Sequence, residues 1–514
     1  MSAVRGAGAP ILAFALLCVL LLVLPGGTVT TVYVNDLFIF LDGAHRVVAG
    51  QVPNRDFHTA LGPLVYYVPA AGLLLSGDLA GAMPAAMALF LAALAPAIAY
   101  ILASRLRPLF AVPFGMFLVL VLAVPTNLGE PVTSLSFAMF YNRIGWGALA
   151  ALMVLYLPPL TPHPRRALLD AAAAALLVVA LVYTKASYGL VAFAFLAFML
   201  LDRGARRWVA VAALATAAAA VAAELVWRGS LAHVEDLRLA ARVSGTRGAI
   251  EHVGSFLRHL PDYALFGLLA GLSLWRTRSP RDLLFFAFCA GAGLALQVQN
   301  SQPWGIVTLH AGAAVAAQRL IGPGPAVPAA LAAGVPLVFL ALLLPTIVHT
   351  GLALGLHTVL AVAQPAERFG LPRFSGIRIG RVWSEAEVGY SRLYLETMQD
   401  GARALAALDV PPERVTVADF ASPFSAGLGL RPPRGDSSWL HWGRNFDGDN
   451  HVAPERLLGD ALVVMEPKRG INAEAVWLVY GDFVERHFDM VRETAFWRVH
   501  VRRGARPQGV AGAR

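Results

Sequence analysis

Residues 82–103, AMPAAMALFLAALAPAIAYILA, run for 22 positions without a charged side chain. A helix of this length crosses a bilayer hydrocarbon core of about 30 Å. Further apolar runs cover 10–24, 63–77, 108–124, 143–159, 167–183, 187–201, 208–226, 262–275, 282–297, 304–320 and 326–348. The pattern predicts a polytopic α-helical membrane protein with about 11 to 13 transmembrane helices.

The composition supports a membrane protein with an appended soluble part. The 514 residues are 57% hydrophobic and 14% charged, which excludes a soluble enzyme of this length. From about Gln364 the chain becomes charged and Pro-interrupted, with no run long enough to span. We therefore expect a transmembrane catalytic domain over 1–350, with a first outer loop at 33–62, and a soluble α/β domain over 351–514. The first run lacks a small-x-small cleavage site, which favours an uncleaved helix.

Positive charge occurs in alternate connections between the apolar runs. These charges are Arg105 and Arg107, Arg165 and Arg166, Arg203 with Arg206 and Arg207, Arg276 with Arg278 and Arg281, and Arg319. The positive-inside rule makes them cytoplasmic, so the final run delivers the C-terminal domain to the outer side of the plasma (inner) membrane. Counting back from Arg105 puts 33–60 inside, whereas an N-in first helix puts it outside. Either 63–77 is re-entrant, or Arg105 and Arg107 break the rule.

The net charge of +9 is spread over these loops rather than gathered on one basic surface, so the sequence does not indicate nucleic-acid binding. In the C-terminal domain, Ser384 and Glu387 form a capping box before a helix to about Leu408. Short strands are expected at 414–420, 460–465 and 496–501, with a helical stretch near 473–489 and a long irregular loop at 420–454. No Gly-rich phosphate loop precedes a helix here.

Ionisable side chains are concentrated in 33–67, YVNDLFIFLDGAHRVVAGQVPNRDFHTALGPLVYY. Such groups beside a membrane boundary are costly unless they are solvated or used, so the alternatives are a solvated connection and a functional loop. The segment resembles the first outer loop of the GT-C superfamily of membrane glycosyltransferases, which includes the protein O-mannosyltransferases and the lipid A aminoarabinose transferases. The residues that carry the resemblance are Asp36, Ala44, Gly50, Pro53, Asp56, Phe57, Gly62, Pro63, Leu64 and Tyr67.

The resemblance implies a polyprenyl-phosphate-linked sugar as donor, transfer at the outer face, and an acidic residue of this loop as base. Where these enzymes commonly have an Asp-Glu pair, this chain has Asn35-Asp36-Leu37. A hydroxyl acceptor loses its proton as it attacks the anomeric carbon, which calls for a carboxylate within hydrogen-bond distance. Asp36 is the first candidate and Asp56 the second. Asn35 and Tyr67, in the same segment, are candidate substrate-binding residues.

The leaving lipid phosphate requires fixed cations near the membrane surface. Lys185, in VYTKASYG, and Arg143, in AMFYNRIGW, lie on the expected outer side, and Arg55 is a third candidate that can instead pair locally with Asp56. A lysine at bilayer depth costs roughly 2.5–3.5 kcal/mol. Lys185 therefore has a function, extends its ammonium group to the headgroups, or pairs with a loop carboxylate.

Three further segments offer polar groups. Gln299 and Asn300 suit sugar hydroxyls, beside Trp304, which we interpret as a membrane anchor, and His310, which we interpret as structural. The amphipathic segment 227–261 is either a lid over the acceptor or a helix on the membrane surface. The loop 439–450, WLHWGRNFDGDN, either binds carbohydrate or is anchored by its own tryptophans. No His or Cys spacing indicates a metal site, and no cofactor is expected.

The sequence therefore predicts a glycosyltransferase that moves a sugar from a polyprenyl-phosphate donor to a glycan, lipid or protein acceptor, by inverting single displacement, in contact with membrane lipids. Two alternatives remain open. A transporter or flippase for a lipid-linked or anionic solute would need charged residues along a central pathway. A non-catalytic envelope assembly protein would have no pocket that joins Asp36, Lys185 and Arg143.

Overall fold

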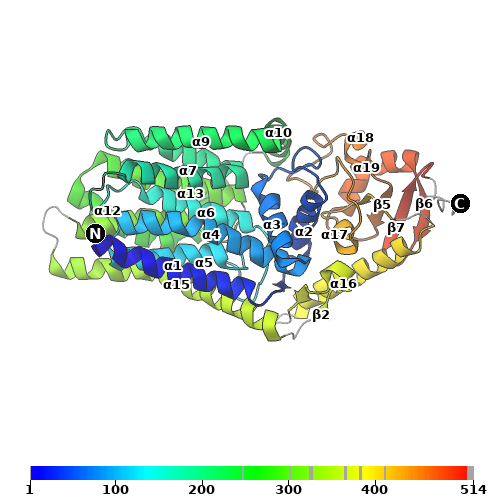
Figure 1. Ribbon diagram of the computed structural model, residues 1–514, viewed down its shortest axis with the longest axis horizontal. Helices are drawn as coiled ribbons and strands as arrows, with labels where there is room; N and C mark the ends of the chain where they lie inside the picture. Colours follow the sequence, from blue (N-terminus) through cyan, green and yellow to red (C-terminus); the bar gives the residue numbers. More distant parts are fainter. Residues whose placement is uncertain are drawn as a thin grey trace.

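The computed structural model describes residues 2–245, 248–300, 302–322, 328–363, 367–380, 385–409 and 412–505. It has two parts, an elongated helical bundle and a C-terminal domain that lies at one end of the bundle (Figure 1). We call the end of the bundle beside this domain the domain end, and the opposite one the far end.

The bundle is built from the apolar runs of the sequence. Its helices are α1 (Ser2–Val23), α4 (Leu79–Arg105), α5 (Pro108–Ala123), α6 (Phe140–Val154), α7 (Arg166–Thr184), α8 (Ala186–Met199), α9 (Arg206–Trp227), α12 (Leu260–Thr277), α13 (Pro280–Asn300), α14 (Val307–Ile321) and α15 (Ala329–Ala363). Among the described helices, α1, α4, α7, α9, α13 and α15 are six that are long and apolar enough to cross a membrane. The prediction of a polytopic α-helical membrane protein is confirmed.

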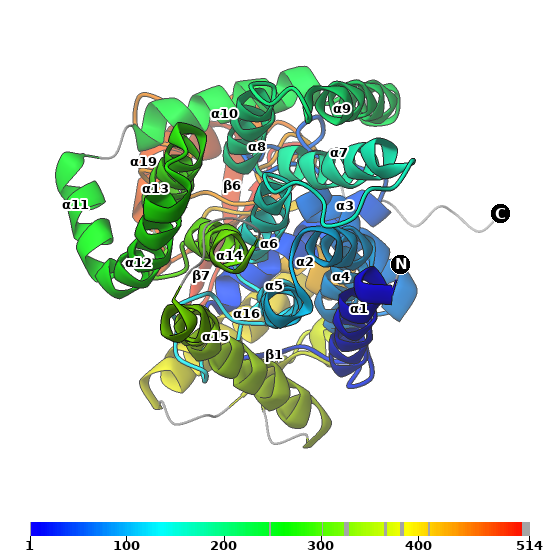
Figure 2. The same ribbon diagram turned by 90° about the vertical axis from the view of Figure 1, so that its left-hand side faces the viewer.

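The interior of the bundle is a layer of almost fully buried helices. Seen from the far end, α5, α6 and α14 lie centrally, with α1, α9, α12 and α15 around them (Figure 2). The outer helices expose large apolar side chains, such as Val226 at 83% and Leu214 at 71%. Exposed apolar surface of this extent suits contact with lipid chains rather than water.

The arginine clusters gather at the far end of the bundle. Three of them form ion pairs with aspartates of neighbouring helices or turns: Arg105 with Asp170 (2.5 Å), Arg281 with Asp202 (2.8 Å) and Arg319 with Asp282 (3.5 Å). The far end is therefore the end that the positive-inside rule assigns to the cytoplasm.

Helix α3 (Leu64–Ser76) begins and ends at the domain end. Because α4 and α7 meet at the far end through Arg105 and Asp170, the start of α4 and the end of α7 both lie at the domain end. Just before α3, Gly62 donates its N–H to the carbonyl oxygen of Thr184 (3.1 Å), the last residue of α7. After α3 the chain enters the first turn of α4 directly. Helix α3 therefore enters and leaves at the domain end, as the re-entrant alternative requires, and 33–62 lies at the domain end as well.

Three helices outside the bundle cover the domain end. Helix α2 (Val34–Val48) lies between the bundle and the C-terminal domain, while α10 (Ser230–Ser244) and α11 (Ala249–Arg258) follow α9 (Figures 1 and 2). Helix α11 exposes Ile250 (88%), Val253 (58%) and Leu257 (58%) on one face. This amphipathic face fits the surface-helix interpretation of the second half of 227–261.

The C-terminal domain is a mixed α/β fold, as expected. Its sheet has the order β4-β5-β7-β6, with β4 (Val415–Val417) parallel to β5 (Val463–Pro467) and β7 (Trp497–Arg502) antiparallel to both β5 and β6 (Phe488–Glu493). Its helices are α16 (Glu385–Ala406), α17 (Phe424–Leu428), α18 (Pro454–Leu457) and α19 (Ala473–His487). The expected helix near 473–489 ends two residues early, because β6 pairs with β7 along its length, and β6 itself was not predicted. Ser384 of the expected capping box lies outside the described residues.

A second, small sheet connects the two parts of the chain. Its order is β1-β3-β2, with β1 (Val29–Thr30) after α1, and β2 (Glu367–Arg368) and β3 (Arg378–Ile379) after α15; the 3₁₀ helix η1 (Pro372–Phe374) lies between β2 and β3. Because β1 and β3 come from opposite ends of the bundle sequence, this pairing holds the start of the C-terminal domain against the end of α1.

A buried arginine joins α2 to the C-terminal domain. Arg46 is 0% exposed, and its guanidinium binds Asp42 one turn earlier (2.6 Å), Asp436 of the C-terminal domain (2.8 Å) and the carbonyl oxygen of Pro433 (2.9 Å). The neighbouring His45 bonds to the carbonyl oxygen of Leu430 (2.8 Å). A buried charge is tolerated only when it is paired and hydrogen-bonded, so these contacts determine where α2 lies.

We predict that Arg46→Met loosens this junction. The substitution leaves Asp42 and Asp436 as unpaired buried carboxylates, a defect that costs about 3–5 kcal/mol. It should lower the temperature at which the detergent-solubilised protein loses monodispersity. The matched control is Arg503→Met, because the pair of Arg503 with Asp489 is exposed and is worth less than about 1 kcal/mol. Equal losses in both variants would contradict the assigned role of Arg46.

Candidate active site

Asp36 lies in the first turn of α2, at the domain end of the bundle. Tyr33, the residue just before α2, has a left-handed backbone conformation (φ 53°) and donates its hydroxyl to Glu130 (2.8 Å). This contact fixes the direction in which the chain enters α2. The partial positive charge of a helix N-terminus favours a carboxylate at this position. The carboxyl group of Asp36 is nevertheless half-buried, and this desolvation raises its pKa to about 7.

Lys185 occupies the break between α7 and α8, where the backbone is extended (φ −157°, ψ 121°). Its ammonium group donates to the side-chain oxygens of Asn142 (3.2 Å) and Asn300, and it lies 5.1 Å from the ring centroid of Tyr141. Asn300 in turn binds the hydroxyl of Tyr188 (2.9 Å). Among the described residues no carboxylate pairs with Lys185. Its ammonium group contacts only neutral amides and an aromatic face there.

Gly145 explains how Tyr188 reaches Asn300. A Cβ atom at Gly145 of α6 would come within 2.6 Å of the Tyr188 ring, so only glycine lets this ring pack against α6. Small residues permit such close approaches between helices in membrane proteins. The pair thereby holds the amide that accepts from Lys185.

Arg444 of the C-terminal domain lies within electrostatic range of Lys185. Its turn is closed by a hydrogen bond from Gly443 N–H to the carbonyl oxygen of Phe446 (3.0 Å), and Gly443 has φ 71°, which favours glycine. Asn445 braces the turn by accepting from the N–H of His441 (2.8 Å) and donating to the carbonyl oxygen of Trp439 (2.8 Å). The Arg444 side chain is half-buried, and no described carboxylate lies within ion-pair distance of it.

Asp36, Tyr141, Lys185 and Arg444 form what we call the charged cluster. Asp36 and Arg444 both lie within electrostatic range of the Tyr141 hydroxyl, and Lys185 stands over its ring. Burial, and to a lesser extent the nearby positive charge of Arg444, lower the pKa of Lys185 to about 7. Among the described residues neither Lys185 nor Arg444 forms an ion pair, and Tyr141 is the residue that lies near both of them and near Asp36.

Arg143 lies next to Asn142 in α6 but is directed elsewhere. Its side chain is 0% exposed and donates to the side-chain oxygen of Asn127 (3.1 Å) and to the carbonyl oxygen of Ala138 (3.1 Å), both in the connection before α6. Its Nε and Nη2 groups have no hydrogen-bond partner. Arg143 therefore makes no contact with the charged cluster among the described residues.

Asp56, Arg55 and Tyr67 form a separate group on the first outer segment. Asp56 accepts from the N–H of Val52 (2.8 Å) and lies 3.4 Å from Arg434, while Arg55 donates to the carbonyl oxygen of Trp227 (3.4 Å). Tyr67 lies within electrostatic range of both charges and forms no side-chain hydrogen bond among the described contacts. These contacts shape the turn at 52–56 and dock it on α9 and the C-terminal domain.

The two remaining residues that the sequence suggested for substrate binding, Asn35 and Gln299, differ in burial. Asn35 is buried and donates to the hydroxyl of Tyr390 (2.9 Å), and its Oδ1 has no partner within the described part of the chain. Gln299, beside Asn300, is exposed and makes no hydrogen bond within the described contacts. Helix periodicity separates Gln299 from the buried Asn300, since adjacent residues of α13 face different sides.

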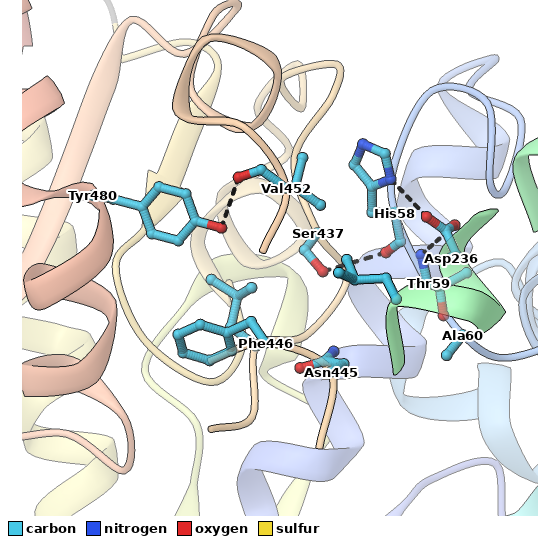
Figure 3. A pocket seen from close by; sticks show the side chains of 11 residues that line it. His58, Thr59, Ala60, Asp236, Ser437, Asn445, Phe446, Val452 and Tyr480 are labelled. Atoms are coloured by element: carbon cyan, nitrogen blue, oxygen red, sulfur yellow. Dashed lines mark hydrogen bonds and ion pairs between the residues drawn. The ribbon is translucent and has the colours of Figure 1, made fainter. Parts of the chain in front are cut away.

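Helix α10 is fixed over the first outer segment by a buried carboxylate. Asp236 binds the imidazole of His58 (2.8 Å), the N–H of Thr59 (3.0 Å) and the amide of Asn54 (3.1 Å). Figure 3 shows Asp236 and His58 at a small pocket that Ser437, Asn445 and Tyr480 of the C-terminal domain also line. Three segments far apart in sequence meet here, next to the turn that carries Arg444.

Sequence reasoning missed Tyr141, Asn142, Tyr188 and Arg444. The first two stand directly before Arg143 in AMFYNRIGW, a stretch singled out for its arginine, and Arg444 lies in the loop considered for carbohydrate binding. Within the described residues, no group of three His, Cys, Asp or Glu side chains comes together as metal ligands.

We predict that Asp236→Ala releases α10 from the first outer segment, because three hydrogen bonds to residues 54–59 are lost. Amide hydrogen exchange at residues 54–60 should then quicken, which mass spectrometry measures. Glu235→Ala is the control, since the adjacent Glu235 is 64% exposed and makes only a 4.0 Å contact with Arg456. Unchanged exchange in Asp236→Ala would show that α10 is held by other contacts.

No protein-family model matches the sequence, and no curated protein matches it. Among solved structures, the chain is similar to the arabinofuranosyltransferase AftD from Mycobacteria, determined by single-particle cryo-electron microscopy, with 14% sequence identity and a TM-score of 0.43. The match covers 96% of this chain and 39% of that chain, so the protein spans about two fifths of the length of the mycobacterial structure. Similarity at this level supports no residue correspondence, and the proposals below rest on the geometry of this chain.

Proposed function

We propose that the protein is a membrane glycosyltransferase that moves a sugar from a polyprenyl-phosphate-linked donor to a hydroxyl of a glycan, lipid or protein acceptor, at the outer face of the membrane. The observation that carries the proposal is the charged cluster: one desolvated carboxylate, Asp36, and two cations without acidic partners, Lys185 and Arg444. All three lie near Tyr141, at the end of the bundle beside the C-terminal domain.

Asp36 is the base of the proposed reaction. The acceptor oxygen attacks the anomeric carbon, the bond from that carbon to the phosphate oxygen breaks, and the hydroxyl proton passes to the Asp36 carboxylate. Attack and departure on opposite faces invert the anomeric configuration. A base works best when its pKa lies near the operating pH, and the raised pKa of Asp36 meets this condition.

Lys185 and Arg444 bind the departing polyprenyl phosphate. Negative charge grows on the phosphate as the bond breaks, and fixed cations in a poorly hydrated site stabilise this charge strongly. Because no described carboxylate neutralises either cation, both remain available to an anionic ligand. Asn142 and Asn300 orient the ammonium group.

The other charged residues of the first outer segment position the site in this proposal. The side chains of Asp56 and Arg55 hold the turn at 52–56, and Arg143 holds the connection before α6 beside Asn142. The position of the charged cluster at one end of the bundle favours chemistry at the membrane surface over the transporter alternative, which needs charges along a central path.

Asp36→Asn should reduce transfer by about 10²–10⁴-fold, the usual contribution of a general base. The assay follows radiolabelled sugar from synthetic polyprenyl-phosphate glucose, mannose and arabinose in membranes that contain the full chain. Asp56→Asn is the matched control, since an amide oxygen can still accept from Val52, and its transfer should fall less than about tenfold. Retained activity in Asp36→Asn, at normal expression, would remove the proposal.

The pH dependence of kcat/KM should be bell-shaped with a maximum near 7. Below the pKa of Asp36, about 7, the base is protonated and the rate falls; above the pKa of Lys185, about 7, the ammonium loses its charge and the rate falls again. In Lys185→Arg the guanidinium stays charged to beyond about pH 12, so the alkaline limb should vanish while the acid limb remains. An alkaline limb that persists in Lys185→Arg would assign it to another group.

A further inference from the structure

A second cavity lies in the C-terminal domain, separate from the charged cluster. It has a volume of about 460 Å³ and is bounded by α16, the ends of β4 and β5, and the turn before β7. Pockets of roughly 300–1,000 Å³ hold small-molecule ligands in proteins.

The topology of the sheet places polar residues at this cavity. Strands β4 and β5 are parallel, so the segments that follow them, with Asp419 after β4 and Lys468 to Gly470 after β5, meet at the same edge. Ligands of α/β folds bind at the carboxyl ends of parallel strands. Asp419 shapes the wall by accepting from the N–H groups of Asn472 (2.6 Å) and Ile471 (3.2 Å).

The lining combines aromatic rings with groups that bind hydroxyls. Tyr390 of α16 is 49% exposed, and Phe496 and Trp497 stand across from it at the start of β7. Asn35 lines the cavity as well; it is only 5% exposed, and its Oδ1 has no hydrogen-bond partner among the residues that the structure describes. A buried unpaired amide oxygen is a costly feature unless a ligand or water satisfies it.

Asn35 and Tyr390 link the cavity to the charged cluster. Asn35 adjoins Asp36 in α2, and the Tyr390 hydroxyl that it binds lies within electrostatic range of both Asp36 and Asp419. A ligand in the cavity can therefore extend a hydroxyl towards Asp36. Lys185 and Arg444 do not line the cavity, so the groups assigned to the donor phosphate stay separate from it.

We propose that this cavity binds the carbohydrate part of the acceptor, so that an oligosaccharide held between α16 and the ends of β4 and β5 presents its terminal hydroxyl to Asp36. The assignment of the bound sugar as acceptor rests on the proposed function, whereas its binding here does not. Sugars present apolar ring faces to aromatic side chains and hydroxyls to amides and carboxylates, both of which this lining offers. A peptide would more readily pair with an edge strand, and the cavity lies beyond the strand ends instead.

Leu393→Trp tests the cavity by filling it. Leu393 lines the cavity from α16 and is 48% exposed, so the larger ring occupies space without disturbing a core. The full chain in lipid nanodiscs is mixed with free homo-oligosaccharides of mannose, glucose, galactose or arabinose, and binding is followed by saturation-transfer NMR. At least one series should bind the wild type, and Leu393→Trp should weaken it by about tenfold or more, the loss of one well-made contact.

Three further variants make the outcome decisive. Leu478→Trp, the same change at a 77% exposed leucine of α19, should bind like the wild type. Arg469→Ala, at an exposed residue of the lining, should weaken binding by about two- to tenfold and guards against misfolding of the tryptophan variant. Asp36→Asn should keep oligosaccharide binding while it loses transfer, which separates this inference from the proposed function.

The inference is overturned if none of the oligosaccharides binds the wild type, or if Leu393→Trp and Arg469→Ala bind them as the wild type does. Synthetic peptides that bind the wild type and are blocked by Leu393→Trp, in place of sugars, would also overturn it.

Discussion

The structure depends on the buried charge of Arg46. A guanidinium removed from water must be paired, and its partners here come from one turn earlier in α2 and from the C-terminal domain. Separating the two parts of the protein would therefore leave uncompensated charges on both. This constraint fixes α2 across the domain end of the bundle, and with it the direction of the first turn, where Asp36 stands. The catalytic proposal follows from that placement, because Asp36 lies within electrostatic range of Tyr141 of α6.

The charged cluster and the cavity show how the two parts share one task. The bundle contributes Lys185 and its amide partners, and the C-terminal domain contributes Arg444 from a turn braced by Asn445. The cavity is built almost wholly by the C-terminal domain and receives only Asn35 from the bundle side. In the proposed reaction, the groups assigned to the donor phosphate and those assigned to the acceptor sugar therefore come from different parts of the fold. Under the proposed function, the C-terminal domain supplies Arg444 to the charged cluster.

Much of the membrane architecture could be predicted from sequence, because a span is a local property of some 20 residues. Lys185 and Asn300 could be found from the local sequence as well. A polar group at the end of an apolar run costs free energy, so it usually has a function. The choice between Asp36 and Asp56 was harder. Both are acidic residues of one segment, and only the neighbours of each carboxyl group separate them: Asp56 caps a backbone N–H, whereas Asp36 is desolvated without an ion pair among the described residues.

The sequence by itself determined the helical bundle, the mixed C-terminal domain and the alternation of charge, because apolar run length, strand patterning and arginine position are encoded locally. Tertiary structure alone decided three matters. It made α3 re-entrant, since the start of α4 packs beside the end of α1; it turned Arg143 towards the connection before α6; and it brought Arg444 to Lys185. Each of these outcomes depends on how the helices and the sheet pack in three dimensions, and no pattern of residue types along the chain specifies it.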